Sequence, residues 1–136
     1  MKILLDTDVL IDVALDRKPF SESASALLNE LEQMPGTGFI AWHSAANFFY
    51  LVSSKQTSKD AIQFIRELIG FIEIAPVCTQ DLVYALSLEM PDFEDALQSA
   101  AAIACKADWI ATRNLKHYKK SPVKALTPGD MLGKLG

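Results

Sequence analysis

Two aspartates three residues apart stand at the start of a predicted helix. Asp92 and Asp95 lie in the segment from Pro91 to Asp95, which precedes a run of helical period. At about 100° per residue, both side chains fall along one edge of the apolar face. An acid in the first turn caps a helix and favours its dipole, which explains Asp92. Asp95 lies past the cap, where an acid is rarely buried without a partner. The residues at the spacing of the buried face are Phe93, Ala96, Leu97, Ala100 and Ala104.

A third acid, Asp6, lies inside an otherwise apolar segment, between Ile3–Leu5 and Val9–Ile11. Burying such a carboxylate is costly unless it is paired or coordinates a cation. Carboxylates that converge without a Lys or Arg partner repel one another, and a hard divalent ion removes that repulsion. Oxygen ligands without His or Cys favour Mg²⁺ or Mn²⁺ over zinc. We therefore predict a metal site formed by Asp6, Asp92 and Asp95.

The elements that must position these acids alternate along the chain. Short β-like runs are separated by longer stretches of helical period, which is typical of a parallel sheet covered by helices. The expected strands are residues 2–5, 38–42, 71–74, 107–112 and 123–126. The expected helices are residues 21–33, 43–53, 58–69 and 79–88, a helix from Pro91, and a short terminal helix from Pro128. The pattern predicts one α/β domain over residues 1–136, with three layers and a central parallel sheet of about five strands.

Polar residues directly follow two of the expected strands. Asp6 and Asp8 follow the first strand, and Thr112, Arg113 and Asn114 follow the fourth. Ligands of open parallel sheets bind outside the carboxyl ends of the strands. We therefore expect these two groups of residues to lie close together.

A basic stretch continues from the fourth strand. Arg113, Lys116, Lys119, Lys120 and Lys124 fall within twelve residues, although the whole chain has a net charge of −4. That charge argues against a protein that coats nucleic acid, but it allows a local basic patch beside an acidic site. We predict that Arg113, Lys116, Lys119 and Lys120 bind phosphates next to the acids. The alternative is a solvated loop.

The composition narrows the remaining classes of function. Half of the residues are hydrophobic, yet the run from Ala100 to Cys105 has only six apolar residues, far below the roughly 20 that cross a bilayer. Asp6 interrupts the N-terminal apolar segment before a signal peptide can form. The two cysteines, Cys78 and Cys105, have no metal-binding spacing. We expect a cytoplasmic protein with no membrane partner.

Three segments together resemble the motifs of PIN-domain ribonucleases. They are Leu4–Asp12, Asp92–Gln98 and Ala107–Asn114, which match the family's opening motif, acidic helix and fourth-strand motif in that order. The resemblance implies an endoribonuclease that needs Mg²⁺ or Mn²⁺ and acts on single-stranded RNA. It also implies the toxin of a toxin–antitoxin pair, held by an antitoxin protein and assembled as a homodimer. Asp6 and Asp95 match catalytic acids of the family, and Thr112 matches its hydroxyl residue beside the site.

The chain departs from the family pattern at two positions. The family commonly carries a Glu on the helix after the second strand, where this chain has no acid in His43–Phe48 and Asn47 is the nearest candidate. The family's final Asp after the fourth strand is replaced by Asn114. Asp92 is the acid that could compensate, so the expected catalytic set is Asp6, Asp92, Asp95, Thr112 and Asn114. Three carboxylates suffice for one metal ion.

Two other functions stay open from the sequence. A phosphatase of the haloacid-dehalogenase type also begins with a strand and Asp-x-Asp, with Asp6 as nucleophile and Asp8 as acid/base. Leu10 stands where that motif has Thr or Val. The phosphatase family also needs a later Lys and usually has a longer chain. The second alternative is a PIN-like module that has lost catalysis and binds RNA or protein. Formation of an acyl-phosphate on Asp6 would distinguish the phosphatase, and metal-dependent cleavage by the wild type but not by Asp6→Asn would distinguish the nuclease from the binding module.

Overall fold

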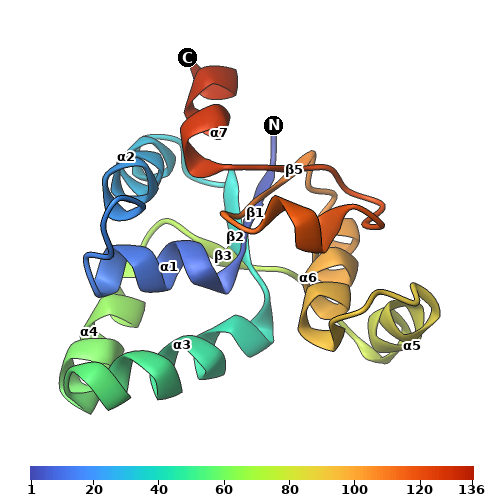
Figure 1. Ribbon diagram of the computed structural model, residues 1–136, viewed down its shortest axis with the longest axis horizontal. Coiled ribbons are helices and arrows are strands. Elements are labelled where there is room, and N and C mark those ends of the chain that lie inside the picture. Colours follow the sequence, from blue (N-terminus) through green and yellow to red (C-terminus); the bar gives the residue numbers. More distant parts are fainter.

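Five short parallel strands form the centre of the molecule in the computed structural model, which describes residues 1–136 (Figure 1). The strands are β1 (Ile3–Leu5), β2 (Gly38–Ile40), β3 (Glu73–Ile74), β4 (Trp109–Ala111) and β5 (Ala125–Leu126). Their order in the sheet is β3-β2-β1-β4-β5, and every neighbouring pair is parallel. The predicted α/β fold class is therefore confirmed.

Helices connect the strands and cover both faces of the sheet. They are α1 (Thr7–Ala14), α2 (Ser21–Glu32), α3 (Trp42–Lys55), α4 (Ser58–Leu68), α5 (Thr79–Ser87), α6 (Phe93–Ala104), the 3₁₀ turn η1 (Leu115–Tyr118) and α7 (Pro128–Leu135). Thr57 and Thr127 cap α4 and α7 through their hydroxyl oxygens, as a side-chain acceptor at the N-cap should. No helix combines the length and apolar character needed to span a membrane.

The side chains of β1 point alternately to the two faces of the sheet, and the core accordingly has two layers. Ile3 and Leu5 face a large cluster that includes side chains of α1, α2, α3, α4 and α7. Leu4, between them, faces a second cluster that includes Ala101 and Ala102 of α6. Successive side chains of a strand point to opposite faces, so one strand can anchor both layers. In Figure 1, α5 and α6 accordingly lie on the opposite side of the sheet from α1 to α4.

The chain reverses its direction of travel across the sheet beside β1. It proceeds from β1 outward to β2 and β3, and then returns to β4 on the other side of β1. Such a switch point opens a crevice at the carboxyl ends of the two central strands. Leu5 pairs in register with Ala111, so the residues that follow β1 and β4 begin at the same level.

Several sequence expectations differ from the structure in detail. Helix α1 and the turn η1 were not predicted, and the helix expected from Pro91 begins at Phe93, with Asp92 as its N-cap. Phe93, which was placed on the buried face, is 54% exposed. Phe93 is the first residue of α6, and burial along this helix does not follow a single stripe, because α6 contacts both the sheet and α5. Its buried residues are Asp95, Ala96, Gln98, Ser99, Ala100, Ala101 and Ala102.

Candidate active site

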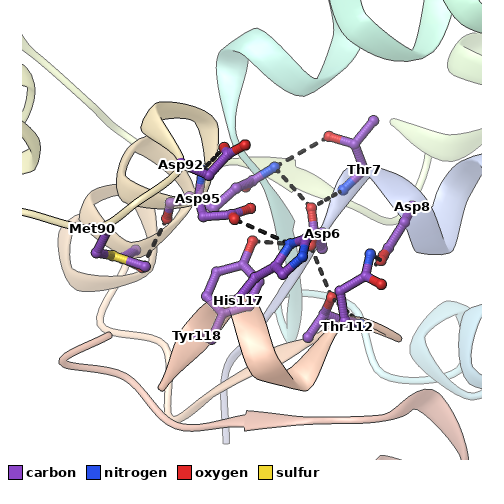
Figure 2. A network of polar contacts seen from close by, with 12 residues as sticks. Asp6, Thr7, Asp8, Met90, Asp92, Asp95, Thr112, His117 and Tyr118 are labelled. Carbon is purple, nitrogen blue, oxygen red and sulfur yellow. Dashed lines mark hydrogen bonds and ion pairs between the residues drawn. The ribbon is translucent and has the colours of Figure 1, made fainter. Parts of the chain in front are cut away.

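Asp6 lies at the carboxyl end of β1 and is the N-cap of α1. One carboxylate oxygen, Oδ1, accepts a hydrogen bond of 2.7 Å from the Thr7 backbone N–H. The other, Oδ2, accepts from the hydroxyls of Thr112 and Tyr118, each at 2.9 Å. These donors come from the first residue of α1, from the residue that follows β4 and from η1, so the side chain is fixed by three segments (Figure 2).

A buried polar layer lies beneath Asp6. Gln98 of α6 is fully buried, and its Nε2 donates to Ser44 Oγ at 2.9 Å and to Thr7 Oγ1 at 3.1 Å. It also lies 3.4 Å from Asp6 Oδ1. Thr7 in turn donates to Ser44 at 2.9 Å. These contacts connect the starts of α1 and α3 to the middle of α6, so a network of buried hydrogen bonds holds Asp6 in place.

The electrostatics of Asp6 are dominated by its burial. Removal from water raises the pKa of Asp6, although the hydrogen bonds from Thr112, Tyr118 and Thr7 act in the opposite direction. A carboxylate held in this way gains from any positive charge that approaches it. The site is therefore suited to a cationic ligand.

Asp95 faces the same space from the first turn of α6. It is 6% exposed, and its Oδ2 lies 3.3 Å from His117 Nδ1 yet has no hydrogen-bond partner. Burial, followed by the charges of Asp92 and Asp6, raises the pKa of Asp95 to about 6. Asp92 is exposed, and its Oδ1 accepts from the Asp95 backbone N–H at 3.1 Å, which confirms the capping role.

Asp8 holds the loop that follows β4. Its Oδ2 accepts from Asn114 Nδ2 at 2.9 Å and from the Arg113 backbone N–H at 3.3 Å, and it lies 3.2 Å from Thr112 Oγ1, the donor to Asp6. Burial and the neighbouring charge of Asp6 raise the pKa of Asp8 to about 7. The amide of Asn114 thus faces an acid on α1.

A similar pairing occurs on the opposite side of the site. Asn47 of α3 donates from Nδ2 to Glu94 Oε2 in the first turn of α6. Glu94 is half-buried, and burial raises its pKa together with the charges of Asp6, Asp92 and Asp95. Glu94 is therefore another acid within the electrostatic reach of the site.

A cleft of about 740 Å³ opens above these side chains. Every acid described so far lines it, with Asn47 and Asn114 between them. The remaining lining residues are Thr7, Ile11, Arg17, Tyr50, Leu51, Ser54 and His117. The structure thus brings the three predicted ligands, Asp6, Asp92 and Asp95, to one cleft.

The predicted phosphate-binding residues divide into two groups. Arg113 forms an ion pair of 2.9 Å with the buried Asp12, and its guanidinium lies 4.5 Å from the ring centroid of Phe20. Arg113 therefore connects α1 to the N-cap residue of α2. The other residues of the group, Lys116, Lys119 and Lys120, are exposed on or just after η1 and take part in no ion pair.

The chemistry of the cleft fits a hard divalent cation. No group of three or more His, Cys, Asp or Glu side chains is already arranged as a metal cage. Nevertheless, Asp95 presents a buried carboxylate oxygen without a hydrogen-bond partner, and burial is the main cause of the raised pKa values of Asp6, Asp8 and Asp95, so an approaching cation would stabilise their charged forms. The carboxylate oxygens of this cleft match Mg²⁺ or Mn²⁺, and His117 is the one lining residue with an imidazole nitrogen.

Sequence reasoning missed several members of this site. Tyr118 and His117 belong to η1, whose sequence has no helical period that would have drawn attention to it. Gln98 was part of a recognised motif but received no role, and Glu94 was passed over between two aspartates. The only available signal was adjacency, because each of these residues lies within three or four positions of a predicted site residue.

The fold and the three motifs indicate a nuclease-like α/β protein, and comparison with known proteins identifies its family. A family model described as the PIN domain matches residues 2–116, and the chain belongs to the PIN-domain family. All three motifs that carry the resemblance lie within the matched residues. No curated protein matches the sequence.

Solved structures support the same fold. VapBC2 of Rickettsia felis, bound to a DNA fragment from its promoter, is similar with a TM-score of 0.73 and 20% identity, over 93% of this chain and 98% of the other. DNA-bound VapBC of Salmonella typhimurium has a TM-score of 0.72 and 15% identity, over 94% and 98%. The sarcin–ricin-loop-cleaving toxin VapC20 of Mycobacterium tuberculosis has a TM-score of 0.66 and 12% identity, over 80% and 87%.

Proposed function

We propose that this protein is an endoribonuclease that uses Mg²⁺ or Mn²⁺ to hydrolyse phosphodiester bonds of single-stranded RNA. The observation that carries the proposal is the meeting of Asp6 and Asp95, from β1 and α6, in one cleft of a PIN domain. The sarcin–ricin-loop-cleaving activity of the similar VapC20 supports RNA as the substrate class. The match to the PIN domain does not favour the phosphatase alternative.

The residues have distinct roles in this proposal. Asp6 and Asp95 would hold the cation, and Asp92 stands at the start of the same helix as a further carboxylate. A bound divalent cation supplies Lewis acidity at a phosphoryl oxygen and makes water a better nucleophile. Thr112 and Tyr118 orient Asp6 by donating to its Oδ2, and Gln98 supports it from below. Preorganised carboxylates of this kind need little rearrangement when the cation enters.

The same comparisons support an antitoxin partner. Two of the similar structures are VapBC assemblies bound to DNA, and a third protein is a toxin. We infer that this chain is the toxin of a toxin–antitoxin pair, that an antitoxin protein binds it, and that it forms a homodimer in the cytoplasm. Lys116, Lys119 and Lys120 would attract the RNA backbone toward the acidic cleft.

The decisive experiment compares the wild type with Asp6→Asn on labelled single-stranded RNA. The wild type should cleave the RNA when Mg²⁺ or Mn²⁺ is added and should stop when the metal is chelated. Asp6→Asn should fold and yet fail to cleave. Metal-independent binding of RNA without cleavage by either protein would instead favour the binding-module alternative.

A further inference from the structure

Glu94 lies where α3 and α6 approach each other at the rim of the cleft. It precedes Asp95 in the first turn of α6, and both side chains line the cleft together with Asp6. Its neighbour Phe93 is mostly exposed, so the first turn of α6 is accessible from outside. A cation that enters the cleft would therefore pass close to Glu94 and Asp95.

Asn47 fixes the direction of the Glu94 side chain. The Asn47 amide carries one end that donates hydrogen bonds and one that accepts them. Only the donating end can face a carboxylate, and Nδ2 of Asn47 indeed donates to Glu94 Oε2. Asn47 therefore uses its amide nitrogen on a neighbouring acid. The acid beside α3 is therefore Glu94, although Glu94 belongs to α6.

The charge of Glu94 has no compensating partner. None of the ion pairs in the structure involves Glu94, and its one side-chain hydrogen bond comes from a neutral amide. The neighbouring Asp95 is more than nine-tenths buried, and its Oδ2 lacks a hydrogen-bond donor. Glu94 thus has no cationic neighbour, and the only one of Asp95 is the exposed ring of His117, 3.3 Å away. Two adjacent acids in this position favour a divalent cation between them and Asp6.

We propose that Glu94 is a cation-binding acid of this site and that Asn47 is the residue that positions it. The inference rests on the proposed metal-dependent function and adds a fourth carboxylate to the expected set of three. Asn47 then acts only through Glu94, so the two residues should behave as one unit in mutagenesis.

Titration of the purified protein with Mn²⁺ by calorimetry tests the proposal. The variants are Glu94→Gln, Asn47→Ala and the double variant, with Glu30→Gln on the exposed surface of α2 as the matched loss of charge. Glu94→Gln should weaken Mn²⁺ binding about tenfold, and Asn47→Ala should weaken it less. In the Glu94→Gln background, Asn47→Ala should have no further effect, because its only partner has already lost its charge.

The outcomes separate this proposal from the proposed function. Equal Mn²⁺ affinity in Glu94→Gln and Glu30→Gln overturns the role of Glu94, even if the wild type cleaves RNA. An independent loss from Asn47→Ala in the double variant overturns its positioning role. If Glu94→Gln weakens Mn²⁺ binding but the wild type cleaves no RNA, the cation site stands and the ribonuclease function fails. A wild type that binds no Mn²⁺ overturns both.

Discussion

Tyr118 donates a hydrogen bond of 2.9 Å to Asp6 Oδ2 and so joins two segments that are 112 residues apart in the chain. Burial and the charge of Asp6 raise the pKa of Tyr118, so the phenol keeps its proton and remains a donor. Thr112 donates to the same carboxylate oxygen. The turn η1 therefore supplies one of the two donors on which this buried oxygen depends.

Tyr118→Phe should damage the site without removing a carboxylate. The variant leaves Asp6 with one donor fewer, which costs about 1 to 3 kcal/mol of unfolding free energy. Because the hydrogen bond lowers the pKa of Asp6, its loss should raise that pKa further and weaken Mn²⁺ binding near pH 6. Thermal unfolding and metal titration measure the two effects. Tyr84→Phe, at a partly exposed phenol on α5 away from the cleft, is the control, and equal behaviour of the two variants would contradict the prediction.

The metal-free protein should lose stability as the pH rises from about 4 to 7. The pKa values of Asp95 and Asp8 are raised to about 6 and about 7, whereas aspartates of the unfolded chain titrate near 3.8. The folded chain binds the protons more tightly, so this contribution is fully present below pH 4 and is lost as the pH passes 6 and 7. We expect a loss of roughly 1 to 3 kcal/mol, measured by thermal unfolding in a chelating buffer.

Asp95→Asn isolates this effect from other titrations. The lowered pKa of His43 acts in the opposite sense at acidic pH, so the difference between variant and wild type is the quantity to compare. The variant should show a flatter decline than the wild type, whereas Glu30→Gln should show the same decline. Parallel profiles for Asp95→Asn and the wild type would show that Asp95 titrates near its ordinary pKa.

The sequence could predict those site residues that are placed by the ends of regular elements. Asp6 and Thr112 directly follow adjacent parallel strands, and Asp95 lies in the first turn of a helix whose start is marked by an N-cap. In each case the local pattern and the topology of a parallel sheet suffice to bring the residue to the crevice. The layered architecture was predictable for the same reason.

The remaining contacts of the site form between side chains of segments that are distant in sequence and meet only in the folded chain. Arg113 was expected to bind phosphate, but it pairs with Asp12, and that pair exists only because residues 7–14 form a helix directly after β1. The apolar run from Val9 to Ile11 does not distinguish a strand from a buried helix by periodicity alone. The contact between Gln98 and Ser44 joins residues 54 positions apart, and no local pattern encodes it.

The lysines of η1 and the following turn should control the affinity for RNA. Lys116, Lys119 and Lys120 are exposed, and replacing all three with Gln should weaken binding of single-stranded RNA and flatten its salt dependence. Each lost phosphate contact lowers the slope of log affinity against log salt by about 0.7, so a loss of about 2 is expected for three contacts. The control replaces Lys55, Lys59 and Lys106, which are exposed on other segments. An unchanged slope in the first variant would identify the run as a solvated loop.

The final prediction concerns the hydrogen bond of 2.9 Å from Asn114 Nδ2 to Asp8 Oδ2. Asn114→Asp sets two carboxylates against each other, so the metal-free protein should lose about 2 kcal/mol of stability. Added Mn²⁺ should stabilise this variant more than the wild type, because the new carboxylate beside the cleft is an anionic ligand. Combining Asn114→Asp with Asp8→Asn restores an amide–carboxylate pair with the roles exchanged, and should recover at least about 1 kcal/mol. Thermal unfolding with and without Mn²⁺ measures both effects. If the double variant is no more stable than Asn114→Asp, the pair does not couple, and if Mn²⁺ acts equally on Asn114→Asp and the wild type, residue 114 lies outside the ligand shell.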